Sequence, residues 1–144
     1  MTSCFGPSFL FAPAHRPELI PKAYERADTV IVDLEDGAGT GDHHAAVRAA
    51  ELDPARTILR TVGPASPSFL DDVALARELG LSTVMIPKVG AVLPDGVAGL
   101  NVIAMIETPQ ALANIAGIVA REEVVGLFWG AEDLIALLGG THSR

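Results

Sequence analysis

The chain has 144 residues, of which 49% are hydrophobic and 19% charged, and it carries a formal net charge of -8. This composition fits one globular domain with a substantial core and excludes a disordered or fibrous chain. The negative charge argues against general nucleic-acid binding, which needs a basic surface. Cys4 is the only cysteine, and no run approaches the ~20 apolar residues of a membrane span. We therefore expect a cytoplasmic protein without nucleic-acid or membrane partners.

Six short apolar runs follow one another along the chain, and each ends in polar or turn residues. They cover residues 8–13, 29–37, 56–62, 82–88, 101–109 and 124–133. Their centres are rich in Val, Ile, Leu, Met and Phe with little polar alternation, which is typical of parallel strands covered on both faces.

The segments between these runs carry helix signals. We expect helices within residues 17–27, 43–52, 66–80 and 109–121, because these have prolines in a first turn, alanine-rich stretches or apolar residues at helical spacing. Residues 90–101, GAVLPDGVAGLN, should hold little helix. The pattern is β-α repeated about six times, in a single domain over residues 1–144.

Two α/β architectures fit this order, a doubly wound sheet and a closed (β/α)8 TIM barrel. No G-x-G-x-x-G follows the first strand, so the dinucleotide-binding sheet is disfavoured. Charged residues end several different strands, as in a barrel active site. A complete barrel needs eight units and about 250 residues. We therefore expect a fragment holding the first six or so units, or a remainder that comes from elsewhere.

Glu107 and Asp133 are candidate metal ligands. Each follows an apolar strand, and the two carboxylates converge if the fifth and sixth strands are neighbours. Two oxygen ligands with other positions left to water and substrate are the usual way in which proteins hold Mg²⁺. The alternative is that both are surface acids, with Asp133 as the N-cap of the helix that follows.

The segment DLEDG places Asp33, Glu35 and Asp36 at the end of the second strand. Asp33 lies inside the apolar run and is costly to bury without partners. Three neighbouring carboxylates repel one another unless a cation offsets them, which favours a site near a cation. The alternative is an acidic turn at Gly37.

Cationic residues end the third and fourth strands. Arg60 presents a planar fork suited to a carboxylate, and with Lys88 and the facing acids it suggests a pocket for an anion and a metal. Arg16 and Lys22 are candidates for binding phosphate groups, although solvated surface charge is the simpler interpretation. The four histidines, His15, His43, His44 and His142, lack a metal-site pattern and are predicted to face solvent, whereas Trp129 is predicted to pack within the barrel.

Five segments resemble, in order and spacing, the CitE-like branch of the HpcH/HpaI aldolase and citrate lyase superfamily. They are FAPAHRPELIPKA, VIVDLEDG, MIPKV, MIETPQALANIAGIV and FWGAEDLIALLGG. That branch includes citrate lyase β subunits, malyl-CoA and citramalyl-CoA lyases, and related thioesterases. The resemblance implies a Mg²⁺-dependent lyase that cleaves a hydroxyacyl-CoA, or an acyl-carrier thioester, into an acyl thioester and a 2-oxo acid. It also implies a homo-oligomer, trimer or hexamer.

The resemblance assigns roles position by position. It implies that Glu107 and Asp133 ligate Mg²⁺ and that Arg60 binds the substrate carboxylate or carbonyl. It places the acids Glu35 and Asp36 close to the metal. It also implies that Arg16 and Lys22 approach the phosphates of CoA. Lys88, from its position at the end of the fourth strand, remains a candidate for binding substrate or CoA.

The chain also departs from the family pattern. The family commonly shows R-[IV]-N after the third strand, whereas this chain has Val62 in place of the amide, and the helix after DLEDG lacks a lysine. The acid that relatives contribute from later strands to a neighbouring subunit is absent, so no general base is assigned. An acyl-CoA thioesterase and a truncated, non-catalytic relative that binds acyl-CoA or a partner are the alternatives.

Overall fold

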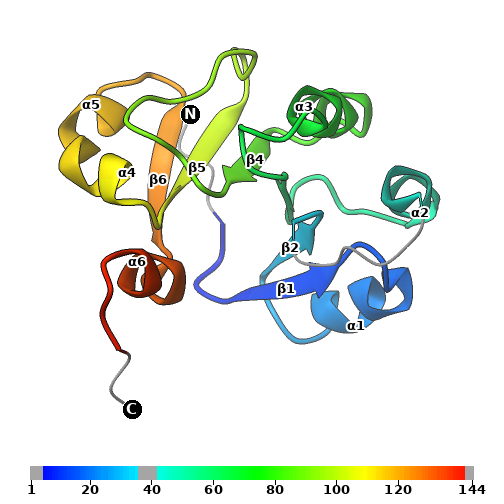
Figure 1. Cartoon of the computed structure of the whole chain (residues 1–144). Coiled ribbons are helices and arrows are strands. Elements are labelled where there is room, and N and C mark those ends of the chain that lie inside the picture. Colours follow the sequence, from blue (N-terminus) through cyan, green and yellow to red (C-terminus); the bar gives the residue numbers. More distant parts are fainter. Residues whose placement is uncertain (1–4, 36–41, 142–144) are drawn as a thin grey trace.

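The computed structural model describes residues 5–35 and 42–141. Within them, six parallel strands form one sheet in chain order, so every pair of successive strands is joined by a crossover. The predicted α/β architecture is confirmed (Figure 1). The strands are β1 (Phe9–Pro13), β2 (Thr29–Asp33), β3 (Thr57–Arg60), β4 (Thr83–Ile86), β5 (Asn101–Ile106) and β6 (Val124–Trp129).

The helices are the 3-10 turn η1 (Pro17–Leu19), α1 (Ile20–Tyr24), α2 (His43–Ala49), α3 (Phe69–Glu78), α4 (Pro109–Ala113), α5 (Ile115–Val119) and α6 (Ala131–Leu137). The helices up to α5 lie in the four predicted segments but are shorter, and a further helix, α6, begins within the apolar run predicted over residues 124–133. The helix predicted over 109–121 breaks at Asn114, whose side-chain amide donates to the carbonyl of Ala91. As predicted, the described segment between β4 and β5 contains no helix.

The sheet separates two hydrophobic layers. Figure 1 shows α1, α2, α3, α4 and α5 around the outside of the curved sheet. Val30 and Val32 of β2 belong to the large cluster shared with these helices, whereas Ile31 belongs to a smaller cluster with Ile58 and Met85 on the opposite face. This alternation follows from the two-residue period of a strand, and it defines an outer and an inner face.

The inner face ends in charged residues. Asp33, Arg60 and Glu107 each lie two residues beyond an apolar member of the inner cluster, namely Ile31, Ile58 and Met105. Since residues two apart in a strand share a face, the strands aim these polar groups inward at their carboxyl ends. The fold therefore gathers them at one rim of the sheet.

The strands β1 and β6 form the two edges of the described sheet. The sheet curves so far that Phe11 of β1 meets Phe128 of β6, with ring centroids 6.0 Å apart in a T-shaped arrangement. Trp129 was predicted to pack within the barrel, but 56% of its surface is exposed, so that prediction was wrong. It belongs to an edge strand that has no further neighbour among the described residues. No helix in the described ranges is both long and apolar enough to cross a membrane.

Candidate active site

The two predicted metal ligands share the same space. Glu107 directly follows β5, and Asp133 lies in the first turn of α6. Both line two adjoining cavities of about 400 Å³ each, one of which also contains Arg60 and the other Lys88. The alternative reading of Asp133 as an N-cap is wrong, because the N-cap position of α6 is Gly130.

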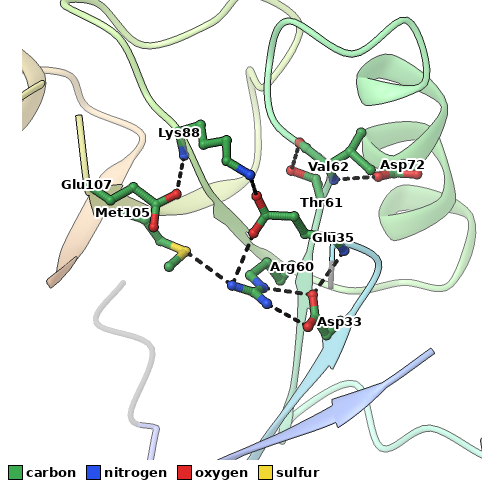
Figure 2. Close-up of polar contacts among 9 residues, drawn as sticks. All are labelled: Asp33, Glu35, Arg60, Thr61, Val62, Asp72, Lys88, Met105 and Glu107. Carbon is green, nitrogen blue, oxygen red and sulfur yellow. Dashed lines mark hydrogen bonds and ion pairs between the residues drawn. The ribbon is translucent and has the colours of Figure 1, made fainter. Parts of the chain in front are cut away.

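Glu107 is held in a fixed orientation. Only 3% of its surface is exposed, and its Oε1 accepts a hydrogen bond of 2.6 Å from the backbone N–H of Lys88 (Figure 2). Burial raises the pKa of the Glu107 carboxyl above its ordinary value, and the negative charges of Glu35 and Asp133 raise it further. Glu107 therefore lies in an electronegative environment that a cation would relieve.

Gly130 provides the room that the Glu107 side chain occupies. A Cβ at position 130 would stand 2.5 Å from the Cβ of Glu107 and still closer to its Oε2. Since Gly130 opens the turn from β6 to α6, the missing side chain lets that turn approach the carboxylate. The Oε2 atom of Glu107 thus lies against the turn that leads to Asp133.

Asp33, Arg60 and Glu35 form a buried ionic group beside this carboxylate. The Nε and Nη2 atoms of Arg60 donate to the two oxygens of Asp33 at 2.7 and 2.6 Å, in a fork-on-fork arrangement. Its Nη1 lies 3.1 Å from Glu35 Oε2 (Figure 2). Its guanidinium carbon lies 4.8 Å from the centroid of the Phe11 ring. The buried Asp33 thus has the cationic partner that its position in the sequence demanded.

The cationic residues separate into two groups. Arg60 and Lys88 reach the site, and the Nζ of Lys88 forms an ion pair with Glu35 Oε1. Arg16 is exposed and pairs with Glu18 at 3.1 Å, while Lys22 lines a small cavity beside Leu10 and Phe11. Neither Arg16 nor Lys22 lines the cavities that contain Glu107 and Asp133. Asp36 lies outside the described residues.

Asp72, on α3, is a buried polar residue that was not predicted from the sequence. Only 2% of its surface is exposed, and its carboxylate accepts from the backbone N–H of Val62 at 2.8 Å and contacts His44 Nε2 at 2.6 Å. The prediction that His44 faces solvent is therefore wrong. A signal was present, because Asp72 falls three residues after Phe69, on the core-facing side of α3.

Thr108 ties the ends of β4 and β5 together. Its hydroxyl donates to the carbonyl of Val89 at 2.6 Å and accepts from the backbone N–H of Ala111, which caps α4. Its neighbour Glu107 bonds the residue before Val89. Two adjacent residues of one loop therefore fix two adjacent residues of the other.

The donor set fits a hard divalent cation. Across residues 5–35 and 42–141, no group of three or more His, Cys, Asp or Glu side chains is arranged to hold a metal ion. Mg²⁺ does not need such a group, because it is commonly held by one or two carboxylates together with water and substrate oxygens. Glu107 and Asp133 supply two carboxylates that line the same cavity.

A curved sheet of six parallel strands with charged residues at the carboxyl ends places the chain in the class of α/β-barrel proteins, as a partial TIM-barrel-like fold. Residues 7–92 and 96–144 match the family described as HpcH/HpaI aldolase/citrate lyase, and the chain belongs to that family. It is 42% identical over 143 residues to a citrate lyase subunit beta-like protein of Mycobacterium tuberculosis, covering 96% of this chain and 52% of the relative. The chain thus spans about half the length of the curated relatives it matches.

Solved structures and a second type of relative extend this picture. The citrate lyase β subunit of M. tuberculosis complexed with oxaloacetate and magnesium superposes with a TM-score of 0.86 at 39% identity, over 99% of this chain and 66% of that one. CitE from the same organism with magnesium, acetoacetate and coenzyme A gives 0.86 at 40% identity, over 99% and 55%. A (3S)-malyl-CoA thioesterase of Cereibacter sphaeroides is 28% identical over 152 residues, covering 94% of this chain and 52% of the relative.

Proposed function

We propose that this chain carries the metal and substrate site of a Mg²⁺-dependent carbon–carbon lyase acting on a hydroxyacyl-CoA. The observation that carries the proposal is that Glu107, Asp133 and Arg60 line one cavity. Solved relatives that contain magnesium together with oxaloacetate, or with acetoacetate and coenzyme A, support this choice of ligands.

Glu107 and Asp133 are the residues that would hold the cation. When bound, Mg²⁺ supplies Lewis-acid polarisation of a substrate carbonyl. In the lyase direction, the bond between the carbinol carbon and the thioester α-carbon breaks. The hydroxyl group loses its proton and becomes the oxo group of a 2-oxo acid, and the α-carbon takes up a proton to give the acyl-CoA.

Arg60 would supply positive charge to the substrate carboxylate or to developing negative charge on the substrate oxygen. Asp33 fixes its guanidinium from the inner face by two hydrogen bonds, so the cation is already oriented before substrate arrives. Glu35 bridges two cations, with one oxygen at Arg60 Nη1 and the other at Lys88 Nζ. We propose that Glu35 sets the net charge beside the Nη1 atom of Arg60. Asp36, the next residue in the sequence, is proposed to act at the same strand end.

Arg16 and Lys22 would contact the phosphates of CoA or of an acyl-carrier thioester. Arg16 is exposed near the carboxyl end of β1, the edge on which the site opens, and Lys22 is exposed on α1. A cytoplasmic homo-oligomer, trimer or hexamer, is part of the same proposal. Large exposed apolar side chains such as Leu70 and Val92 offer surface for such contacts.

An acyl-CoA thioesterase is the second candidate, supported by the malyl-CoA thioesterase relatives. The test is to incubate the protein with Mg²⁺ and citryl-, malyl- or citramalyl-CoA, and to quantify 2-oxo acid and free CoA. Release of a 2-oxo acid that is lost in Asp133→Ala supports the lyase. Free CoA without 2-oxo acid indicates the thioesterase, and the absence of both products rejects catalysis in favour of binding alone.

A further inference from the structure

Lys88 has an unusual backbone. Its φ is 51°, and it is the one non-glycine residue with a positive φ among the described residues. Residues with a Cβ seldom adopt this left-handed conformation, and they retain it only where the surrounding structure enforces it. Lys88 follows Pro87 at the end of β4, at the rim where the site lies. The strained residue and the candidate metal ligands therefore share one location.

The left-handed conformation of Lys88 is accompanied by a hydrogen bond to Glu107. The backbone N–H of Lys88 points across to the next strand end and donates to Glu107 Oε1 at 2.6 Å (Figure 2). The hydroxyl of Thr108 donates to the Val89 carbonyl at 2.6 Å, so the two loops are joined at two successive positions. The conformation of Lys88 is thus coupled directly to the orientation of the Glu107 carboxylate.

The hydrogen bond leaves one carboxylate oxygen for a ligand. With Oε1 engaged by Lys88, Oε2 lies against Gly130, where the chain turns toward Asp133. A carboxylate rotated about its last torsion would lose both relationships. The backbone N–H of Lys88 therefore fixes the plane of the Glu107 carboxylate, with its second oxygen on the side of the turn that leads to Asp133.

The side chain of Lys88 acts on a different residue. Its Nζ pairs with Glu35, whose second oxygen lies 3.1 Å from Arg60 Nη1. The ammonium also interacts electrostatically with Asp133 and Glu107. It therefore adds positive charge beside the two carboxylates, which opposes a divalent cation there.

We propose that Lys88 is a positioning residue whose two parts act in opposite directions on a divalent cation bound by Glu107 and Asp133. The left-handed backbone strengthens binding because it orients Glu107. The ammonium weakens binding because it places a second positive charge near the cation. The same ammonium holds Glu35 beside Arg60. This inference rests on the proposed function only in so far as Glu107 is a metal ligand.

The test compares Lys88→Gly with Lys88→Val, which both remove the ammonium but differ in backbone preference. Glycine adopts a positive φ freely, whereas a β-branched residue resists it. In calorimetric titrations with MgCl2, Lys88→Gly should bind the cation at least as tightly as the parent. Lys88→Val should bind it roughly tenfold more weakly than Lys88→Gly, because the free energy needed to hold valine in the left-handed conformation reduces the free energy of metal binding.

A second variant that tolerates a positive φ controls for the added backbone flexibility of glycine. Lys88→Asn also removes the ammonium and tolerates the left-handed region, so it should follow Lys88→Gly. Circular dichroism establishes that the variants remain folded. Equal affinities for folded Lys88→Gly and Lys88→Val would overturn the backbone role, and weaker binding by both Lys88→Gly and Lys88→Asn would overturn the role of the ammonium.

A readout without metal keeps the inference separate from the proposed function. In the ¹⁵N-labelled protein, the amide proton of residue 88 should resonate far downfield and exchange slowly, and both features should disappear in Glu107→Ala. This result also decides the backbone role if Lys88→Val fails to fold. If the parent binds no Mg²⁺ but the amide responds, the proposed function fails and the positioning of Glu107 stands. An amide that ignores Glu107→Ala overturns the inference.

Discussion

Gly130 and Glu107 lie so close together that position 130 has no room for a side chain. A Cβ there would stand 2.5 Å from Glu107 Cβ and 3.2 Å from its Cδ, with Oε2 nearer still. Contacts of this length do not occur between unbonded atoms, so one of the two residues must move if a methyl group is added. The orientation of a buried carboxylate therefore depends on the absence of an atom from the opposite turn.

Gly130→Ala should displace Glu107 and weaken Mg²⁺ binding by at least about tenfold, a loss of roughly 1.4 kcal/mol. Calorimetry with MgCl2 measures the change. Gly90→Ala is the matched control, because a Cβ at Gly90 has nothing within 4 Å. If both variants bound Mg²⁺ as the parent does, the contact between positions 130 and 107 would not shape the site.

Asp133→Ala should abolish Mg²⁺ binding and leave the fold unchanged, because Asp133 is exposed and forms part of the cavity wall. Glu132→Ala is the control, since it removes the same charge one residue away on the same wall. Calorimetry reports binding, and circular dichroism reports the fold. A cation that bound to Asp133→Ala as to the parent would show that the ligands lie elsewhere.

Arg60→Met should destabilise the protein more than Asp33→Asn does. Arg60 is the shared partner of Asp33 and Glu35. Glu35 keeps Lys88 when Arg60 is lost, whereas the buried Asp33 loses its cationic partner, at a cost of about 3–5 kcal/mol. Asp33→Asn leaves Arg60 paired with Glu35 and should cost less. Urea unfolding monitored by circular dichroism ranks the two variants. The reverse order would mean that Arg60 is not the centre of this group.

Asp72→Ala should cost about 1–3 kcal/mol of unfolding free energy, because the Val62 amide loses its acceptor. His44→Ala should cost less, since His44 is partly exposed and the carboxylate keeps its bond to Val62. Chemical denaturation gives both values. If His44→Ala lost more unfolding free energy than Asp72→Ala, the imidazole and not the Asp72–Val62 hydrogen bond would be the main stabilising group.

Glu107→Gln should stabilise the metal-free protein at neutral pH while removing its Mg²⁺ binding. Burial and neighbouring carboxylates raise the pKa of Glu107 above its ordinary value, so ionised Glu107 disfavours the folded state. In the parent, the stability that protonated Glu107 contributes is present below its unfolded pKa and is lost as pH rises through the folded value. Glutamine keeps the acceptor for Lys88 without the charge.

Thermal unfolding without metal, followed from acidic to neutral pH, checks this prediction. The difference in melting temperature between Glu107→Gln and the parent should grow as pH rises through the raised pKa of Glu107. Asp95→Asn, a carboxylate in the loop before β5, serves as the control. A parent that melted above Glu107→Gln at neutral pH without metal would contradict the repulsion inferred at this rim.

Much of the fold could be predicted because it follows from local pattern. The six strands are continuous apolar runs, and the polar residue that ends each run has to lie at the rim of a parallel sheet. Glu107 and Asp133 follow neighbouring strands, so their convergence required only the strand order.

The partners across strands could not be predicted in the same way. The pairing of Lys88 with Glu35 joins residues 53 positions apart, and it depends on a left-handed lysine that residue type does not indicate. The contact of Asp72 with Val62 depends on the depth to which α3 packs. The exposure of Trp129 depends on how many neighbours β6 has. These features arise from tertiary packing and not from local propensity.

The two-residue alternation of the strands also limits which changes the site can tolerate. Glu107 faces inward only because it stands an even number of positions after Ile103 and Met105. Deleting one residue from β5 would send that carboxylate toward the helices and turn an isoleucine into the cavity. Replacing one strand residue changes a single side chain. Changing the length of a strand by one residue would instead turn its inner-face residues outward and bring its outer, apolar residues to the inner face.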